Sequence, residues 1–363
     1  MTALAPDPAG LPESPSPHPL LERGLSLLRR YPALLPTLSL AFGIGSFVLV
    51  QRGESMARMM AFIALIGWPW LLLEDLIGGW LSRHSRGRLP PATARFLTQQ
   101  VQQELLYFSL PFLFIAMNWV PEQMAFVALA AGLALAATLD PLYWHRIAPN
   151  AGLSLAFHAA CSFVAALSIL PIAVHLPVEL ALPIAFATTA VILLASLPRT
   201  WVPALDLNTA SNEPLRWRQR LRRFAMPLAL ATVLALAWFG RAAIPPAGLW
   251  VRDARITTAM DGHEPGPAIT SVDAATLVGA DASLSAFVAV RAPQGLSQAV
   301  VFEWVHDGMV VDRIPAQIDG GREAGFRTYS RKQHFGVAPQ GKWRVDLRTP
   351  QGQLIARRSF EVR

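Results

Sequence analysis

Charged side chains are scarce in this sequence. They make up 15% of the 363 residues, whereas hydrophobic residues make up 53%. A typical soluble domain has about 25% charged residues, so this balance argues against an ordinary soluble globular protein. The composition favours an integral membrane protein whose main partner is the lipid bilayer.

Cysteine is nearly absent. Cys161 is the only one, which excludes a disulfide within the chain and a cysteine-based zinc site. A domain outside the cytoplasm would therefore be held together by its hydrophobic core alone. Cys161 itself lies in an apolar segment, and we expect a buried, inert thiol rather than a nucleophile.

The sequence also lacks the short motifs that carry catalysis. It contains no His-Glu-x-x-His metal-binding pattern and no Gly-x-Ser-x-Gly nucleophile turn. We therefore predict no catalytic residue and no cofactor, and the ligand spacings indicate no metal site.

Long apolar runs are the dominant feature of the first two thirds of the chain. Each run is close to the roughly 20 residues that a helix needs to cross a hydrocarbon core. We predict seven spans, at 33–50, 59–80, 98–119, 122–139, 152–174, 178–197 and 224–243. They form a predicted membrane domain over 31–244. The segment 1–30 is rich in proline, which predicts a disordered tail that ends in a short amphipathic stretch.

The arginines between these runs predict an orientation, because positively charged loops stay in the cytoplasm. With a cytoplasmic N-terminus, fourteen arginines lie inside, and the short outer loops contain only Arg52 and Arg58. The inner set is Arg23, Arg29, Arg30, Arg83, Arg86, Arg88, Arg95, Arg146, Arg199, Arg216, Arg218, Arg220, Arg222 and Arg223. Seven spans then place the C-terminal part outside the cytoplasm. The net charge of +7 lies mostly beside the membrane, which indicates anionic lipid headgroups and no nucleic-acid partner.

From residue 249 the pattern changes to short β-rich segments separated by turn signals. We predict strands at 251–259, 283–291, 299–306, 309–316, 326–331, 343–348 and 354–362. Asp307-Gly308 between two of them is typical of a two-residue hairpin loop. The predicted fold class is therefore a polytopic α-helical membrane domain of about seven spans, followed by an all-β, immunoglobulin-like sandwich over 249–363.

Three stretches of the C-terminal part resemble a bacterial domain of unknown function, number 2914. They are Trp304-Val305-His306-Asp307-Gly308, Gly325-Phe326-Arg327-Thr328-Tyr329-Ser330-Arg331-Lys332 and Gly341-Lys342-Trp343-Arg344-Val345, with Phe360-Glu361-Val362 closing the chain. In hydropathy and layout, the apolar half resembles the domain of unknown function 5924 that is found with it. The resemblances imply a bacterial multi-pass membrane protein. Combined with the arginine distribution, this predicts a protein of the inner membrane with a periplasmic C-terminal domain. They imply no reaction, ligand or catalytic residue.

Ionisable residues near the predicted cytoplasmic ends of the spans form a first candidate site. They are Glu74, Asp75, Glu104, Asp140, His145 and His158. Such groups are costly in lipid unless they are paired, hydrated or functional. One interpretation is an inward-facing polar pocket that binds a divalent cation or relays protons. The other, more common, is that they mark helix ends at the headgroup level and pair with nearby arginines.

A basic and aromatic set in the predicted β-domain forms a second candidate site. It consists of His306, Arg327, Tyr329 and Lys332. Arg327 and Tyr329 are two positions apart and therefore share one face of a strand, which suits an exposed binding surface. Trp304 and Trp343 lie in alternating strands, which predicts core positions rather than a surface on which a sugar stacks.

Two hypotheses for the function follow. In the first, the helices anchor an extracytoplasmic sandwich that binds an envelope protein or glycan, without catalysis. In the second, the protein is a membrane transporter or enzyme that acts through the cytoplasm-side pocket. The first is favoured, because the recognisable stretches lie in the β-domain and the sequence has no catalytic motif.

Overall fold

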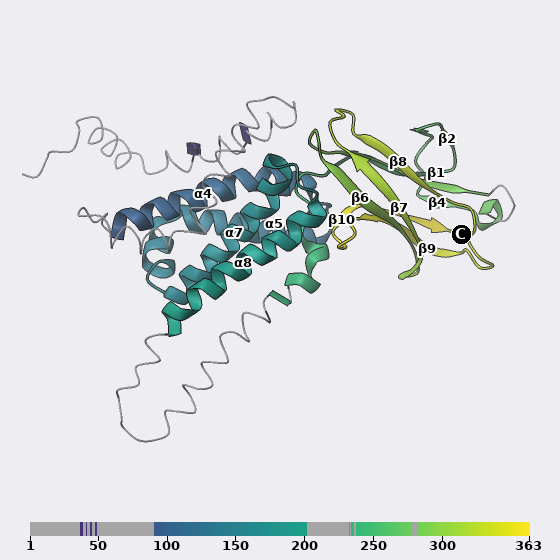
Figure 1. Cartoon of the computed structure of the whole chain (residues 1–363). Coiled ribbons are helices and arrows are strands. Elements are labelled where there is room, and N and C mark those ends of the chain that lie inside the picture. The colour runs from purple at the N-terminus through teal and green to yellow at the C-terminus, as the bar shows by residue number, and fades with distance from the viewer. Residues whose placement is uncertain are drawn as a thin grey trace, which may run out of the picture.

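The computed structural model describes residues 91–201, 237–277 and 282–363, with isolated positions at 37–48 and 232–235. A helical part and a β-sheet domain lie side by side along the long direction of the molecule (Figure 1). The predicted span 59–80, most of the predicted spans 33–50 and 224–243, and the predicted tail 1–30 lie outside the described residues.

The helical part confirms four predicted apolar segments as helices. In chain order the elements are α4 (Pro91–Ala116), α5 (Pro121–Thr138), α6 (Asp140–Leu142), the π-helix η1 (Tyr143–Ile147), α7 (Ala151–Ala173), α8 (Val178–Trp201) and the 3-10 helix η3 (Arg241–Ala243). Within the described residues, α5 and the Gly152–Ala173 part of α7 are long and apolar enough to cross a bilayer. The number of seven spans remains a prediction.

Local sequence signals set where these helices begin. Pro121 opens α5, where its missing N–H costs nothing because the first helical N–H groups have no partner in the helix. Asn150 caps α7, and its side-chain oxygen accepts a hydrogen bond from the backbone N–H of Leu153 at 3.1 Å. Helix α7 packs against both α4 and α8, and α4 packs against both α5 and α7, so α4 and α7 are the inner helices of the described bundle. Cys161 on α7 is fully buried, as predicted.

All seven predicted strands are present. The elements of the β-domain are β1 (Trp250–Thr257), β2 (Met260–Asp261), β3 (Glu264–Pro265), β4 (Ser271–Val272), the 3-10 helix η4 (Ala274–Leu277), β5 (Leu284–Arg291), β6 (Ser297–His306), β7 (Met309–Asp319), β8 (Phe326–Lys332), β9 (Gly341–Arg348) and β10 (Leu354–Val362). The short strands β2, β3 and β4 were not predicted, because two residues are too few to show an alternation of apolar and polar positions.

Two main sheets form the domain. One has the order β1-β5-β8, and the other has the order β4-β10-β9-β6-β7. All pairs in them are antiparallel except β4 with β10. Buried apolar side chains of both sheets belong to one core cluster, so the two sheets pack face to face as a sandwich.

The centre of the sandwich core is aromatic. Trp304 and Trp343 are 0% and 2% exposed, which confirms their predicted core positions. The indole N–H of Trp304 donates to the hydroxyl of Ser330 at 2.9 Å, and that of Trp343 donates to the carbonyl of Pro339 at 2.7 Å. Both buried donors are therefore satisfied, which removes the main cost of burying tryptophan.

The turn between β6 and β7 has the predicted form. His306 pairs with Met309 across a two-residue loop, and Asp307 and Gly308 both have positive φ, 46° and 87°. Two consecutive left-handed residues define the hairpin turn whose twist matches that of the strands.

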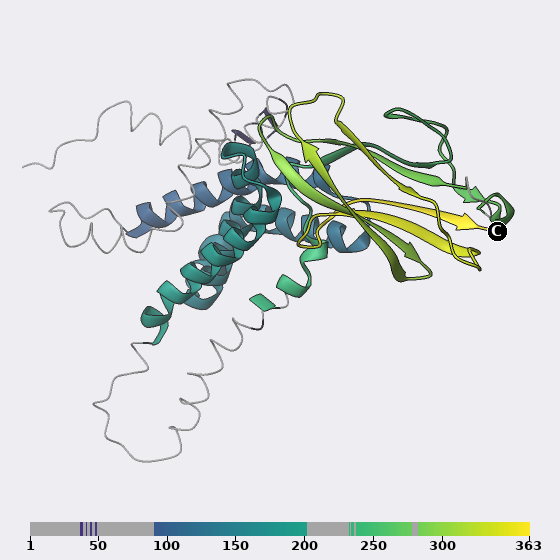
Figure 2. The ribbon, with the colours of Figure 1, turned by 45° about the vertical axis from the view of Figure 1, so that its right-hand side comes forward.

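The sandwich sits at one end of the helical bundle, and the C-terminus lies at the far end of the sandwich (Figures 1 and 2). Three segments at the ends of helices lie at this junction, and each contacts the sandwich: 117–120, 174–178 and 240–249. Gly248 has φ of +97°, and a Cβ at this position would lie 3.1 Å from the Cβ of Pro171 in α7. Glycine is therefore suited to the place where the chain leaves the bundle and enters the sandwich.

Candidate functional site

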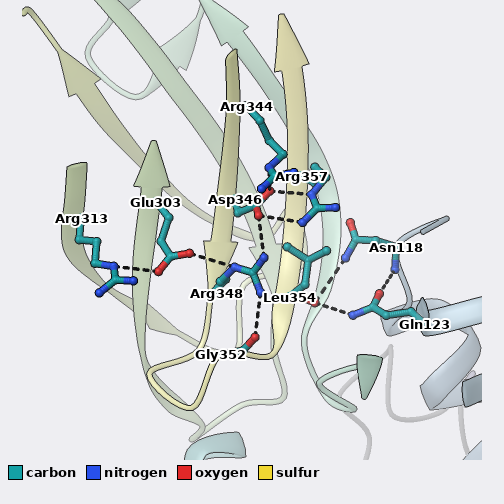
Figure 3. A network of polar contacts seen from close by, with 10 residues as sticks. All are labelled: Asn118, Gln123, Glu303, Arg313, Arg344, Asp346, Arg348, Gly352, Leu354 and Arg357. Atoms are coloured by element: carbon teal, nitrogen blue, oxygen red, sulfur yellow. Dashed lines mark hydrogen bonds and ion pairs between the residues drawn. The ribbon is translucent and has the colours of Figure 1, made fainter. Parts of the chain in front are cut away.

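Side-chain amides join the bundle to the sandwich. The side-chain amide of Asn118, after α4, donates to the carbonyl of Ile355 at 2.7 Å. That of Gln123, in the first turn of α5, donates to the carbonyl of Leu354 at 2.9 Å. The oxygen of Gln123 also accepts the backbone N–H of Asn118 at 2.6 Å (Figure 3). Gln123 therefore holds the backbone at Asn118 in place while both side-chain amides bind the start of β10.

Two glutamines of the sandwich make a second set of contacts with the helical part. The oxygen of Gln298, on β6, accepts the backbone N–H of Val178 at 2.7 Å, which satisfies one of the free N–H groups at the start of α8. The side-chain amide of Gln353 donates to the carbonyl of Ile244 at 3.2 Å. Both glutamines are fully buried. Buried polar groups are costly unless they are paired, so these contacts favour one fixed arrangement of the two parts.

A row of charged residues crosses the outer face of the larger sheet (Figure 3). Arg313 lies opposite Glu303, Glu303 lies opposite Asp346, and Asp346 lies opposite Arg357. The Nε of Arg313 lies 3.0 Å from Glu303. Arg357 binds Asp346 with two nitrogens, at 2.7 and 2.8 Å. The row therefore runs through four neighbouring strands with a cation at each end and two carboxylates in the middle.

Arg348 completes this network from the same face. It lies 3.1 Å from Glu303 and 2.7 Å from Asp346, and it also donates to the carbonyl of Gly352 at 3.0 Å. Arg344 adds a fourth cation, 3.4 Å from Asp346. The two carboxylates would repel each other without these partners, since like charges directly opposite on neighbouring strands are destabilising.

The network keeps Asp346 ionised. Burial alone would raise the pKa of this carboxyl, but the hydrogen bonds from Arg357 and Arg348 outweigh burial and hold the pKa below its usual range. The same pairing raises the pKa of Arg357. Each group thus stabilises the charge of the other, which is the pattern of a structural ion-pair network rather than of a catalytic acid.

Arg327 and Tyr329, predicted to share a face, do lie on the outer face of the smaller sheet. The short hairpin β2–β3 lies next to them. Arg327 pairs with Glu264 of β3, and the Tyr329 ring meets the His263 ring edge-on at 6.0 Å between centroids. Tyr329 is 39% exposed. The hairpin therefore widens this face with one acidic and one imidazole side chain.

The other two members of the predicted set lie elsewhere. Lys332 is 8% exposed, pairs with Asp312 and lies over the rings of Phe335 and Trp343. It follows Tyr329 by three positions and is therefore on the opposite side of β8. His306 stacks on Trp343 with centroids 4.3 Å apart, and its Nε2 lies 2.9 Å from the carbonyl of Gln340. The structure therefore brings two of the four residues together on an exposed face.

The candidate membrane pocket is only partly within the described residues. Glu74 and Asp75 lie outside them. Asp140 accepts a hydrogen bond from the amide of Gln99 at 2.9 Å, and His158 lies 3.4 Å from the amide of Gln102. His145 is exposed, with Nδ1 3.0 Å from the carbonyl of Pro141. Glu104 is half-buried on α4. Among the described residues no group of three or more His, Cys, Asp or Glu side chains could hold a metal ion.

The glutamines of α4 were not singled out from the sequence as site residues. Gln99, Gln102 and Gln103 are 1–2% exposed and form a polar stripe inside the bundle. Gln99 and Gln103 both donate to the carbonyl of Ala137, at 2.9 and 2.7 Å. Gln102 and Gln103 follow Gln99 by three and four positions, about one helical turn, so their spacing could have predicted that they share one face of the helix.

The network of the larger sheet was not predicted either. Arg344, Asp346 and Arg348 alternate along β9, which indicates a shared polar face. The sequence alone does not say which residues of β6 and β10 lie opposite them, because that depends on the register between strands distant in the chain.

Comparison with protein-family models gives two matches. Residues 15–282 match the family of unknown function DUF5924, and residues 297–362 match the protein of unknown function DUF2914. This confirms the two resemblances and their order. The second match coincides with β6 to β10, while β1 and β4 fall in the first, so the sandwich draws strands from both. No curated protein matched the chain. Because the first match covers more than half of the sequence, the chain belongs to the family of unknown function DUF5924.

Proposed function

We propose that this is a multi-pass protein of the bacterial inner membrane, which presents an extracytoplasmic sandwich domain that binds an envelope protein or glycan. One observation carries the proposal. The helix connections that the arginine distribution assigns to the outer side, near residues 118–121 and 174–178, are the connections that contact the sandwich. This arrangement supports the proposed orientation, in which the end of the bundle that contacts the sandwich faces outward.

Exposed apolar side chains on the helices support the membrane position. Leu129 and Leu135 on α5 are 61% and 56% exposed, and Val191 and Leu194 on α8 are 60% and 57% exposed. Large apolar side chains in such numbers on outer helix faces are favourable against lipid and costly against water. Seven crossings bring the chain from a cytoplasmic N-terminus to an outer C-terminal domain.

The strand order supports an immunoglobulin-like sandwich. The first sheet joins β1, β5 and β8, and the central strands of the second are β10, β9 and β6. This is the division of strands between two sheets that such domains use, with connections that cross from one sheet to the other. Domains of this architecture commonly serve as binding modules, which is an analogy of fold and not of site.

The binding surface that we propose is the outer face of the smaller sheet. Arg327 and Tyr329 lie there with His263 and Glu264 of the β2–β3 hairpin. The Tyr329 ring offers a stacking surface and a polar hydroxyl, and the Arg327 guanidinium and the Glu264 carboxylate beside it offer directional hydrogen bonds. Such a set suits a sugar ring or a polar protein surface.

A cross-linking experiment in living cells tests the proposal. A photoreactive phenylalanine analogue replaces Tyr329 in the full chain, and the control position is the exposed Val337. We expect covalent adducts from position 329 only, with a discrete mass shift for a protein partner. Isolated cell-wall glycan should sediment the wild-type protein and not the Tyr329→Ala variant if the partner is a glycan. Absence of both results would contradict the proposal.

The α4 glutamine stripe favours a second candidate, a transporter or enzyme that uses the bundle interior. The side-chain oxygens of Gln99, Gln102 and Gln103 are buried and have no hydrogen-bond partner among the described residues. Together with Asp140 and His158 they offer a polar path through apolar surroundings. Binding of a divalent cation or substrate that is lost in both Glu104→Gln and His158→Ala would favour this candidate.

A further inference from the structure

A cavity of about 520 Å³ lies where the bundle meets the sandwich. The connection between α4 and α5, with Asn118 and Trp119, forms one wall. Strands β1 and β10 form the other, with Arg252, Arg357 and Arg358. A volume of this size accommodates a small ligand or a lipid headgroup.

The lining of the cavity is positively charged. Its single acidic residue, Asp253, pairs with Arg255. Arg357 is already bound to Asp346. Two guanidinium groups, those of Arg252 and Arg358, therefore remain without a carboxylate among the described residues.

The bonding of these two arginines leaves donors for a ligand. Arg358 donates to the backbone carbonyls of Ala254 and Arg357, at 2.6 and 2.8 Å, so its position is fixed and its charge is not neutralised. Arg252 is exposed and makes no hydrogen bond or ion pair with any described residue. Burial, followed by repulsion from Arg252, holds the pKa of Arg291 below its usual range.

The rim of the cavity is aromatic and faces the helices. Trp119 is 72% exposed, and its ring packs edge-on against Phe114 with centroids 5.9 Å apart. Phe114 is itself 54% exposed on α4. Tryptophan at the end of an apolar helix is typical of the headgroup level of a bilayer. Phe114 on α4 thus packs against Trp119, which lines the cavity together with the arginines.

We propose that this cavity binds a phosphate-bearing anion, and that its source is the headgroup of an anionic lipid in the leaflet next to the sandwich. Guanidinium groups match phosphate oxygens with paired hydrogen bonds, and Arg252 and Arg358 supply them. The acyl chains then lie along Phe114 and Trp119. The lipid source rests on the membrane position proposed above, whereas the phosphate chemistry does not.

The test uses the full chain in a neutral detergent and measures bound lipid by native mass spectrometry. The probes are phosphatidylglycerol, phosphatidylcholine and inorganic phosphate. The variants are Arg252→Gln alone, because this exposed side chain supports no other residue, and Arg252→Gln with Arg358→Gln. The matched control is Arg331→Gln, an exposed arginine on β8 away from the junction. We expect phosphatidylglycerol to bind better than phosphatidylcholine, and the double variant to bind it roughly tenfold or more weakly.

The outcomes separate the possible sources of the ligand. Binding of phosphatidylglycerol without inorganic phosphate identifies a lipid. If inorganic phosphate displaces phosphatidylglycerol, and this competition is lost in the same variants, the ligand is a soluble phosphate compound. The proposed recognition of phosphate by the two arginines then still holds. The proposal is overturned if the wild-type protein binds neither phosphatidylglycerol nor inorganic phosphate. It is also overturned if Arg252→Gln and the double variant bind these probes as tightly as the wild-type protein does. Cross-linking at Tyr329 is independent of these arginines, so it reports separately on the proposed function.

Discussion

Glu303 and Asp346 lie directly opposite each other on β6 and β9, and Arg348 contacts both carboxylates, at 3.1 and 2.7 Å. The side chains of Glu303 and Asp346 are 17% and 1% exposed, so water screens their repulsion poorly. Arg348 therefore determines whether this pair stabilises the sheet or destabilises it.

Removal of this bridge should weaken the sandwich. We expect Arg348→Met, which keeps the apolar part of the side chain, to lower the free energy of unfolding by about 2 kcal/mol. Arg313→Met is the control, because Arg313 is 67% exposed and, among the described residues, pairs with Glu303 alone. It should cost less than about 1 kcal/mol. Urea unfolding followed by tryptophan fluorescence measures both. Equal losses would show that the bridge has no special role.

The depressed pKa of Asp346 makes part of the stability depend on pH. Because the folded-state pKa lies below the unfolded value of about 3.9, the contribution is present in full above that pH and is lost as the pH falls further. We expect Asp346→Asn to cost about 3 kcal/mol at neutral pH. The difference between the variant and wild type should shrink as unfolding is measured at increasingly acidic pH below 4. A difference that stays constant would contradict this assignment.

The amide pair at the junction should control how firmly the two parts are joined. Gln123→Leu removes the shorter of the two hydrogen bonds to the carbonyl of Leu354, where the amide of Asn118 remains at 3.4 Å. It also leaves the backbone N–H of Asn118 without the oxygen that accepts it. We expect the sandwich to stay folded while the distribution of distances between spin labels in bundle and sandwich broadens. Gln317→Leu, which removes a hydrogen bond to Ser297 within the sandwich, is the control and should leave the distribution unchanged. A narrow distribution in both would mean that apolar contacts alone fix the arrangement.

The boundaries of the sandwich predict which fragments fold. A fragment of residues 249–363 contains both sheets and should give dispersed amide resonances. A fragment of 297–362, the length of the second family match, lacks β1 and β5 and therefore lacks two of the three strands of the smaller sheet. We expect the shorter fragment to remain unfolded, since its core residues would face water on one side. A folded shorter fragment would show that the smaller sheet is dispensable.

The sequence was informative where a pattern is local. Alternation placed Trp304 and Trp343 in the core, Asp307-Gly308 marked the hairpin, and apolar runs marked α4, α5, α7 and α8. Each of these depends on residues within a few positions of one another. The helix α4 begins at Pro91, seven positions before the predicted span, because propensity continues a helix beyond its apolar segment.

The candidate sites were harder to predict because they join distant segments. Asn118 meets Ile355, and Gln298 meets Val178, across more than 100 positions in each case. The sequence offers no periodicity for such contacts. Lys332 was grouped with Tyr329 by composition, but three positions along a strand place it on the other face, and a strict period of two would have separated them.

The location of the C-terminus is the most direct test of the account. Alkaline phosphatase, which is active only outside the cytoplasm, and a fluorescent protein, which matures only inside it, are fused in turn after Arg363 of the full chain. If the sandwich lies outside the cytoplasm, the phosphatase is active and the fluorescent protein is dark. A bright fluorescent protein with an inactive phosphatase would contradict it, and would place the sandwich in the cytoplasm.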